Sequence, residues 1–164
     1  MSVWNQLFEA LFGWRKRFGR MDFAILKTMM LLAAVDGDIS ISELAQFRKK
    51  AGECRGFDVE NFASLWETAV NAAEENRRLA GKVPEPELIN AFVKAATPDF
   101  VDEVVQGKSA ERDHAFAALE EMAESDEDLT GIEQRCLKAL ARHVRRVRES
   151  MMSARYVSPG MRAG

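Results

Sequence analysis

Cysteine, histidine and glycine-rich loops are scarce in this chain of 164 residues, and each shortage argues against a class of function. Cys54 and Cys136 lie far apart and form no CxxC pair, so we expect two buried free thiols rather than a disulfide framework or a zinc site. No phosphate-binding glycine loop, Gly-x-Ser-x-Gly elbow or His-Glu-x-x-His sequence occurs. His114 and His143 each fall on an expected helix, where a packed or solvated ring is commoner than a catalytic base. The sequence therefore predicts that the protein is not an enzyme.

Long apolar runs and a leader sequence are also missing. No uninterrupted apolar stretch approaches the roughly 20 residues that cross a bilayer. The N-terminus lacks the basic segment, apolar core and small-residue cleavage site of a secretory signal. We therefore expect a cytoplasmic protein.

The charge balance gives little support to a nucleic-acid partner. The net charge is −3, with 47% hydrophobic and 30% charged residues, which is the composition of a soluble globular domain. Arginines gather between residues 142 and 155, but they surround an expected helix and carry no interleaved aromatic rings except Tyr156. We interpret them as a solvated face and predict that the protein binds no nucleic acid.

Apolar residues recur at helical spacing along the chain, and no segment alternates as a strand does. We therefore expect an all-α fold, a compact bundle of about seven or eight helices: an amphipathic N-terminal helix at 1–20, a helical domain at 21–152 and a disordered tail at 153–164. Residues 21–35 are apolar nearly all round, which predicts the central buried helix. Thr97-Pro98 is expected to end one helix and separate it from the next.

The first 20 residues form an amphipathic pattern for which two interpretations stay open. The helix either packs on the core or rests on an anionic membrane surface, because aromatic rings suit the interface and basic groups suit lipid headgroups. The residues that would make this contact are Trp4, Phe8, Phe12, Trp14, Arg15, Lys16 and Arg17. Peripheral contact with the inner membrane therefore remains an alternative to a purely cytoplasmic protein.

An acidic turn at residues 33–43 returns in altered form at 123–133, which predicts two pseudo-repeated helix–acidic turn–helix units. The first copy reads Ala-Ala-Val-Asp-Gly-Asp-Ile-Ser-Ile-Ser-Glu, and the second reads Ala-Glu-Ser-Asp-Glu-Asp-Leu-Thr-Gly-Ile-Glu. Ser40 with Glu43, and Thr130 with Glu133, have the spacing of a capping box at a helix start. Capping of a helix start therefore accounts for the Ser or Thr and the Glu of each motif, but not for its paired aspartates.

The paired aspartates in each turn leave a second interpretation open, which is a divalent cation site. The candidate ligands are Asp36, Asp38, Glu43, Asp126, Asp128 and Glu133. Calcium takes about six to eight oxygen ligands, so one turn alone would hold it weakly and with much water. The spacing is not that of an EF-hand, because Phe47 stands where the bidentate Glu would be. A weak calcium or magnesium site is the most that these residues support.

The pattern Ala-x-x-Asp-Gly-x-Ile-Ser-x-x-Glu at 33–43, with its echo at 123–133, resembles the TerB-like tellurite-resistance family. It is also similar to the TerB-like domain of membrane-anchored DnaJ-type co-chaperones. The resemblance implies a small helical bundle without catalytic activity that binds a divalent metal at its acidic turns and acts in tellurite or stress resistance. The second turn departs from the pattern, with Glu127 in place of Gly37 and Gly131 inside the expected helix.

Two functions from different classes therefore remain open. The first is a metal-responsive, TerB-like stress protein. The second is a helical module that binds a protein partner or the membrane surface, with acidic turns that are purely structural.

Overall fold

The computed structural model describes residues 19–35, 37, 39–54, 59–79, 82–125 and 131–156 of the chain. In order, these residues form α2 (Arg20–Ala34), α3 (Ile41–Glu53), α4 (Val59–Leu79), α5 (Glu85–Ala96), the π-helical segment η1 (Thr97–Val101), α6 (Asp102–Gln106), α7 (Ser109–Ser125) and α8 (Ile132–Tyr156). No strand occurs in the described ranges, so the predicted all-α fold is confirmed. The expected amphipathic helix at the N-terminus lies outside the described residues.

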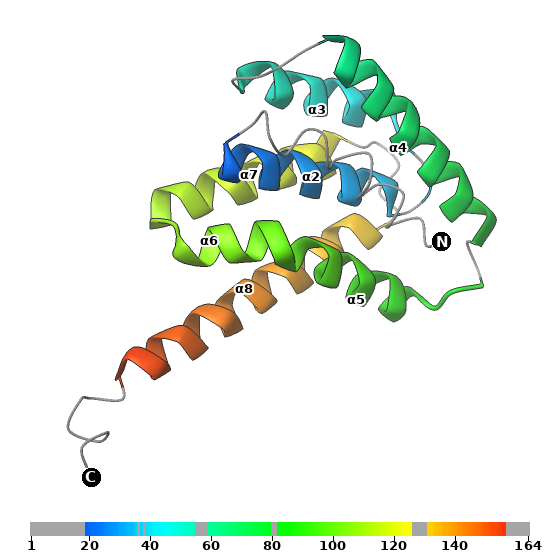
Figure 1. The fold of residues 1–164 in the computed structure, drawn as a ribbon. Helices are drawn as coiled ribbons and strands as arrows, with labels where there is room; N and C mark the ends of the chain where they lie inside the picture. The colour runs from blue at the N-terminus through cyan, green and yellow to red at the C-terminus, as the bar shows by residue number, and fades with distance from the viewer. Residues whose placement is uncertain are drawn as a thin grey trace.

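Helix α2 lies at the centre of the bundle. Figure 1 shows α3 on one side of it and α6 on the other, and α2 contacts every other helical element of the described chain. All residues from Phe23 to Ala34 are buried. A helix with neighbours on all sides has no face to leave polar, which explains its nearly continuous apolar sequence. The expected central helix is therefore confirmed.

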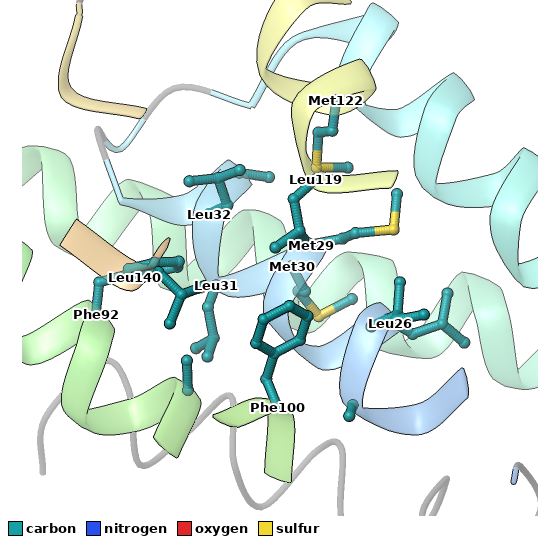
Figure 2. Packing of buried hydrophobic residues seen from close by; sticks show 14 of the residues in the cluster. Leu26, Met29, Met30, Leu31, Leu32, Phe92, Phe100, Leu119, Met122 and Leu140 are labelled. Atoms are coloured by element: carbon teal, nitrogen blue, oxygen red, sulfur yellow. The ribbon is translucent and has the colours of Figure 1, made fainter. Parts of the chain in front are cut away.

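The core around α2 is filled by aliphatic, methionine and aromatic side chains. Figure 2 shows Met29 and Met30 of α2 among the side chains of Phe100, Leu119 and Met122. All five are at most 1% exposed. Methionine is flexible enough to fill the irregular gaps between helices that cross at different angles.

Aromatic rings join the outer helices to one another. Phe47 of α3 lies 5.5 Å from Phe62 and 5.7 Å from Trp66 of α4, between ring centroids. Phe100 of η1 meets Phe116 of α7 edge to face at 5.4 Å. Such pairs add about 0.5–1.5 kcal/mol beyond the apolar area that they bury.

Helices α5 and α6 are continuous through η1, so the expected break at Thr97-Pro98 is absent. Proline has no N–H, so Pro98 donates no backbone hydrogen bond to the preceding turn. The Thr97 hydroxyl donates to the carbonyl of Val93 at 2.7 Å, and the N–H of Asp102 donates to the carbonyl of Thr97, five residues back. The helix therefore widens by one residue at η1 rather than ending.

This continuity lowers the number of separate helices. The described residues hold six continuous helical segments, because α5, η1 and α6 form one. The expected seven or eight included two helices on either side of Thr97-Pro98 and the N-terminal helix outside the described residues. The prediction of an all-α bundle is confirmed, and the described residues do not support the count of seven or eight helices.

One charged side chain, Lys27, lies inside the apolar central helix and is 0% exposed. Its ammonium Nζ lies 2.6 Å from Oδ2 of Asp99 in η1. Removing a charge from water costs several kcal/mol, which a closely paired opposite charge offsets. This ion pair ties η1 to the centre of α2.

Helix α8 begins inside the bundle and ends outside it. It contacts α2, α5, α6 and α7, and Figure 1 shows its second half extending away from them towards the C-terminus. It continues to Tyr156, past the expected start of the tail at residue 153. No helix in the described ranges combines the length and apolar character needed to span a membrane.

The two cysteines are free and buried, as expected from their spacing. The Cys54 thiol donates to the carbonyl of Lys50 at 3.2 Å. Burial, with a smaller effect of the nearby Asp22 carboxylate, raises the pKa of Cys54 to about 11. The thiol is therefore neutral at physiological pH and unsuited to nucleophilic chemistry.

Replacing Asp99 tests the role of the buried ion pair. We expect Asp99→Ala to lower the free energy of unfolding by about 3–5 kcal/mol, because it removes the anion opposite a buried ammonium. Adding Lys27→Met should restore most of this loss, since methionine fills a similar volume without charge. Urea unfolding followed by circular dichroism measures both changes.

The exposed Asp102, on the same continuous helix, provides a matched control. We expect Asp102→Ala to change the free energy of unfolding by about 0.5 kcal/mol or less. A double variant no more stable than Asp99→Ala alone would contradict the proposed role of the pair.

Candidate functional site

The first acidic turn joins α2 to α3 and is described at Gly37, Ile39 and Ser40. Gly37 has a φ of +79°, in the left-handed region that glycine enters without steric penalty. Its N–H donates to the carbonyl of Ala34 at 3.2 Å, which closes the end of α2. Helix α2 therefore ends before Gly37, as the first predicted helix–acidic turn–helix unit requires.

The start of α3 is a capping box, as expected from the sequence. The backbone N–H of Glu43 donates to Ser40 Oγ at 3.1 Å, and the N–H of Ser40 donates to Glu43 Oε1 at 3.0 Å. Glu43 is 0% exposed, and its second oxygen, Oε2, is also buried. One carboxylate oxygen of this candidate ligand is therefore engaged in starting a helix.

The guanidinium of Arg77, near the end of α4, lies at this turn. Its Nε and Nη2 atoms donate to the carbonyl of Gly37 at 3.3 and 3.2 Å. Gly37 also packs closely on α4, because a Cβ there would lie 2.8 Å from the backbone nitrogen of Arg77. The neighbours of Gly37 in sequence are Asp36 and Asp38. The chain thus places its own cation beside a turn that carries two carboxylates.

The second turn starts its helix differently from the first. Gly131 has a φ of +77°, and its carbonyl accepts from the N–H of Arg135 at 3.0 Å. Gly131 therefore holds the position before α8 that Ser40 holds before α3. Thr130, the expected capping residue, lies outside the described residues, but α8 begins at Ile132, one residue later than a cap at Thr130 implies, because a left-handed residue cannot be part of a right-handed helix.

This shift moves Glu133 within its helix. Glu133 is the second residue of α8, whereas Glu43 is the third residue of α3. A capping box requires the third position, so Glu133 is out of register with the expected box. The two turns are similar in sequence but not equivalent in backbone geometry.

An arginine accompanies the second turn too. A Cβ at Gly131 would lie 2.6 Å from Nη1 of Arg135, so the guanidinium lies against the glycine. Arg135 also donates through Nε to Glu85 Oε1 of α5 at 2.7 Å. Each described turn glycine therefore has an arginine side chain beside it.

The predicted metal ligands are only partly described. Asp36, Asp38, Asp126 and Asp128 lie outside the described residues, whereas Glu43 and Glu133 are 0% and 4% exposed. In the part of the chain that the structure describes, no three His, Cys, Asp or Glu side chains form a group that could hold a metal ion. The calcium or magnesium site therefore remains a prediction.

A groove of about 1110 Å³ between α5 and α8 was not expected from the sequence. The apolar side chains Ile89, Val93 and Ala139 line it and are half-buried. The basic side chains that line it are exposed: Lys94, Arg135, Arg142, Arg145 and Arg146. The groove therefore has an apolar floor and a positively charged rim.

Most of this rim is not neutralised from within the described chain. Glu85 is the one carboxylate among the lining residues, and it pairs with Arg135. Within the described ranges, Lys94, Arg142, Arg145 and Arg146 make no ion pair. The arginines of α8, interpreted from sequence as a solvated face, thus gather partly along one groove.

Spacing gives a partial signal for this groove. Arg135, Ala139, Arg142 and Arg146 follow one another at three or four residues, which places them on one side of α8. The packing of α8 against α5, however, joins distant parts of the chain. Spacing alone could not identify the opposite wall.

A smaller hollow of about 170 Å³ lies between α3 and α7 and contains His114. The Nε2 atom of this ring lies 2.8 Å from Nζ of Lys50. An ammonium can only donate, so a protonated Lys50 makes Nε2 the acceptor and occupies the lone pair that a general base would use. The expected non-catalytic role of His114 stays a prediction.

Comparisons with models of protein families, with curated proteins and with solved structures find no match to this chain. The TerB-like resemblance of the two turns therefore stays a prediction.

Replacing Gly37 tests the packing of the first turn. We expect Gly37→Ala to lower the free energy of unfolding by about 2 kcal/mol or more, because alanine is strained at positive φ and its Cβ meets the backbone of α4. Urea unfolding gives the size of the effect.

Gly52 provides the control, since it is an exposed residue of α3 with nothing within 4 Å of an added Cβ. We expect Gly52→Ala to leave the free energy of unfolding unchanged or to raise it by up to about 1 kcal/mol. Equal losses in the two variants would refute the close packing of Gly37.

Proposed function

We propose that this chain is a non-enzymatic helical protein that acts by docking on a partner macromolecule, and that its acidic turns are structural. The observation that carries the proposal is the groove between α5 and α8, in which an apolar floor lies beneath five basic side chains. All of these except Arg135 lack an ion-pair partner in the described chain. Exposed apolar surface framed by polar groups is typical of interaction sites.

The geometry of the first turn supports the structural part of this proposal. Ser40 and Glu43 cap α3, and Arg77 donates to the carbonyl of Gly37. Capping gives Ser40 and Glu43 a structural role, and the guanidinium binds the turn backbone, without an added ion.

The TerB-like resemblance suggests the setting in which such a protein would act. It places the docking role in tellurite or general stress resistance, either in the cytoplasm or at the inner face of the membrane. The partner is a protein of that system in this proposal, and membrane contact through the first 20 residues is the alternative.

A second candidate function, binding of a divalent cation, is favoured by the burial of two glutamates. Glu43 and Glu133 follow the two turns and are 0% and 4% exposed, which is uncommon for glutamate. Buried carboxylates beside further aspartates would attract Ca²⁺ or Mg²⁺ if the turns were open to them.

Calorimetry separates the two candidates. Titration with Ca²⁺, Mg²⁺, Mn²⁺ and Zn²⁺ should give no saturable heat if the turns are structural, because Arg77 already lies at the first of them. The control is the Asp36→Ala/Asp126→Ala variant, which lacks one aspartate from each turn. Saturable heat that this variant loses would establish the cation site and reject purely structural turns.

Photo-crosslinking in cells tests the docking role itself. A photoreactive amino acid at Asn90, an exposed lining residue of the groove, should capture a discrete partner. The same amino acid at Gln106, an exposed amide on the same continuous helix but outside the groove, should not. The captured species should also disappear with Ala139→Phe, which fills the floor. Equal capture from the two positions would reject the groove as a docking surface.

A further inference from the structure

We infer that the groove between α5 and α8 binds an acidic amphipathic α-helix of a partner protein. This inference rests on the proposed docking function and adds the chemical class of the partner.

Charge is the first observation that points to this occupant. The net charge of the chain is −3, yet the groove is lined by five basic side chains and one carboxylate. Glu85, the carboxylate, is already paired with Arg135, which leaves the rest of the rim to an outside anion. Electrostatic complementarity sets the orientation and the association rate of such a partner, so a segment rich in Asp and Glu is favoured over a neutral or basic one.

The floor makes the partner amphipathic rather than simply acidic. Ile89 and Val93 stand four residues apart on α5, and Ala139 of α8 lies with them in the groove lining. Apolar side chains spaced by three or four residues on an incoming helix would cover this floor while its acidic residues meet the rim.

Size argues for a peptide segment rather than a small molecule. The groove volume of about 1110 Å³ lies above the usual range of small-ligand pockets, about 300–1,000 Å³. The lining residues of one wall run from Glu85 to Pro98, which at 1.5 Å per residue is roughly 20 Å of helix. A partner helix of three to four turns, about 14 residues, matches that length.

The undescribed ends of this chain do not have the composition of such a ligand. Residues 1–18 contain one carboxylate, Glu9, and three basic residues, and residues 157–164 contain Arg162 and no Asp or Glu side chain. Neither end complements a positive rim. An acidic segment of a partner therefore complements the groove better than either of these two segments does.

Nucleic acid fits the groove less well than an acidic helix. No Phe, Tyr or Trp is among the lining residues, so the groove offers no aromatic platform for base stacking. A phosphate backbone would bind the basic rim but would make no favourable contact with the half-buried aliphatic floor.

Fluorescence anisotropy with defined peptides tests the inference on the full chain. The probe is a labelled peptide of about 15 residues with leucine at every third or fourth position and glutamate elsewhere, and the comparison peptide replaces each glutamate by glutamine. We expect the acidic peptide to bind at least about tenfold more tightly, with an affinity that falls as salt is raised.

Charge reversals on α8 locate the binding site. Arg142→Glu/Arg146→Glu should raise the Kd of the acidic peptide about tenfold or more, because it places carboxylates opposite carboxylates. Lys138→Glu, an exposed reversal on the same helix outside the groove, should change it less than about twofold. Ala139→Phe should also abolish binding without altering charge, and circular dichroism confirms that each variant remains folded.

Three results would overturn the inference. Equal binding of the two peptides would show that acidic residues are not required. Equal Kd values in the Arg142→Glu/Arg146→Glu and Lys138→Glu variants would show that the peptide does not bind in the groove. Tighter binding of single-stranded DNA, of anionic liposomes or of a second copy of the chain would assign the groove to that occupant instead. If the Asn90 crosslink persists while the acidic peptide fails to bind, the docking function stands and only the class of partner is wrong.

Discussion

The complete burial of α2 is the constraint on which the rest of the structure depends. Because all residues from Phe23 to Ala34 are buried, every other helical element of the described chain must cover part of this helix. Lys27 adds a more specific requirement, because its buried ammonium needs a carboxylate at one position on the helices packed around α2. Asp99 supplies it from η1 at 2.6 Å, which fixes how the segment from α5 to α6 lies across α2.

Because one face of α5 packs on the core, the edge of that face forms one wall of the groove. Phe92, Ala95 and Ala96 face the core and are buried, which leaves Ile89 and Val93 half-buried at the edge of that face. Helix α8 packs along this edge and then leaves the bundle. The groove is thus formed by two helices that are each held by the core but do not close fully on one another.

Local signals in the sequence predicted the helices well, and long-range contacts explain what they missed. The capping residues Ser40 and Glu43 interact over three positions, so their pattern was sufficient. Thr97-Pro98 was expected to break a helix from its local preference, but the Thr97 hydroxyl and the pairing of Asp99 with Lys27 favour continuity. The contact of Arg77 with Gly37 and both walls of the groove join distant parts of the chain, and spacing in sequence carries no information about such pairs.

The arginine at the first acidic turn is already hydrogen-bonded within the protein, whereas two arginines of the groove make no ion pair in the described chain. At the first turn, Arg77 donates to the carbonyl of Gly37, so a guanidinium of the chain already lies at this turn. Two unit charges about 4 Å apart near a protein surface interact by about 4 kcal/mol, so an ion and the guanidinium would exclude one another at close range. A ligand in the groove, by contrast, would meet Arg142 and Arg146 without displacing an ion pair of the described chain. This difference is the physical reason for proposing an interaction surface at α5 and α8 rather than at the turns.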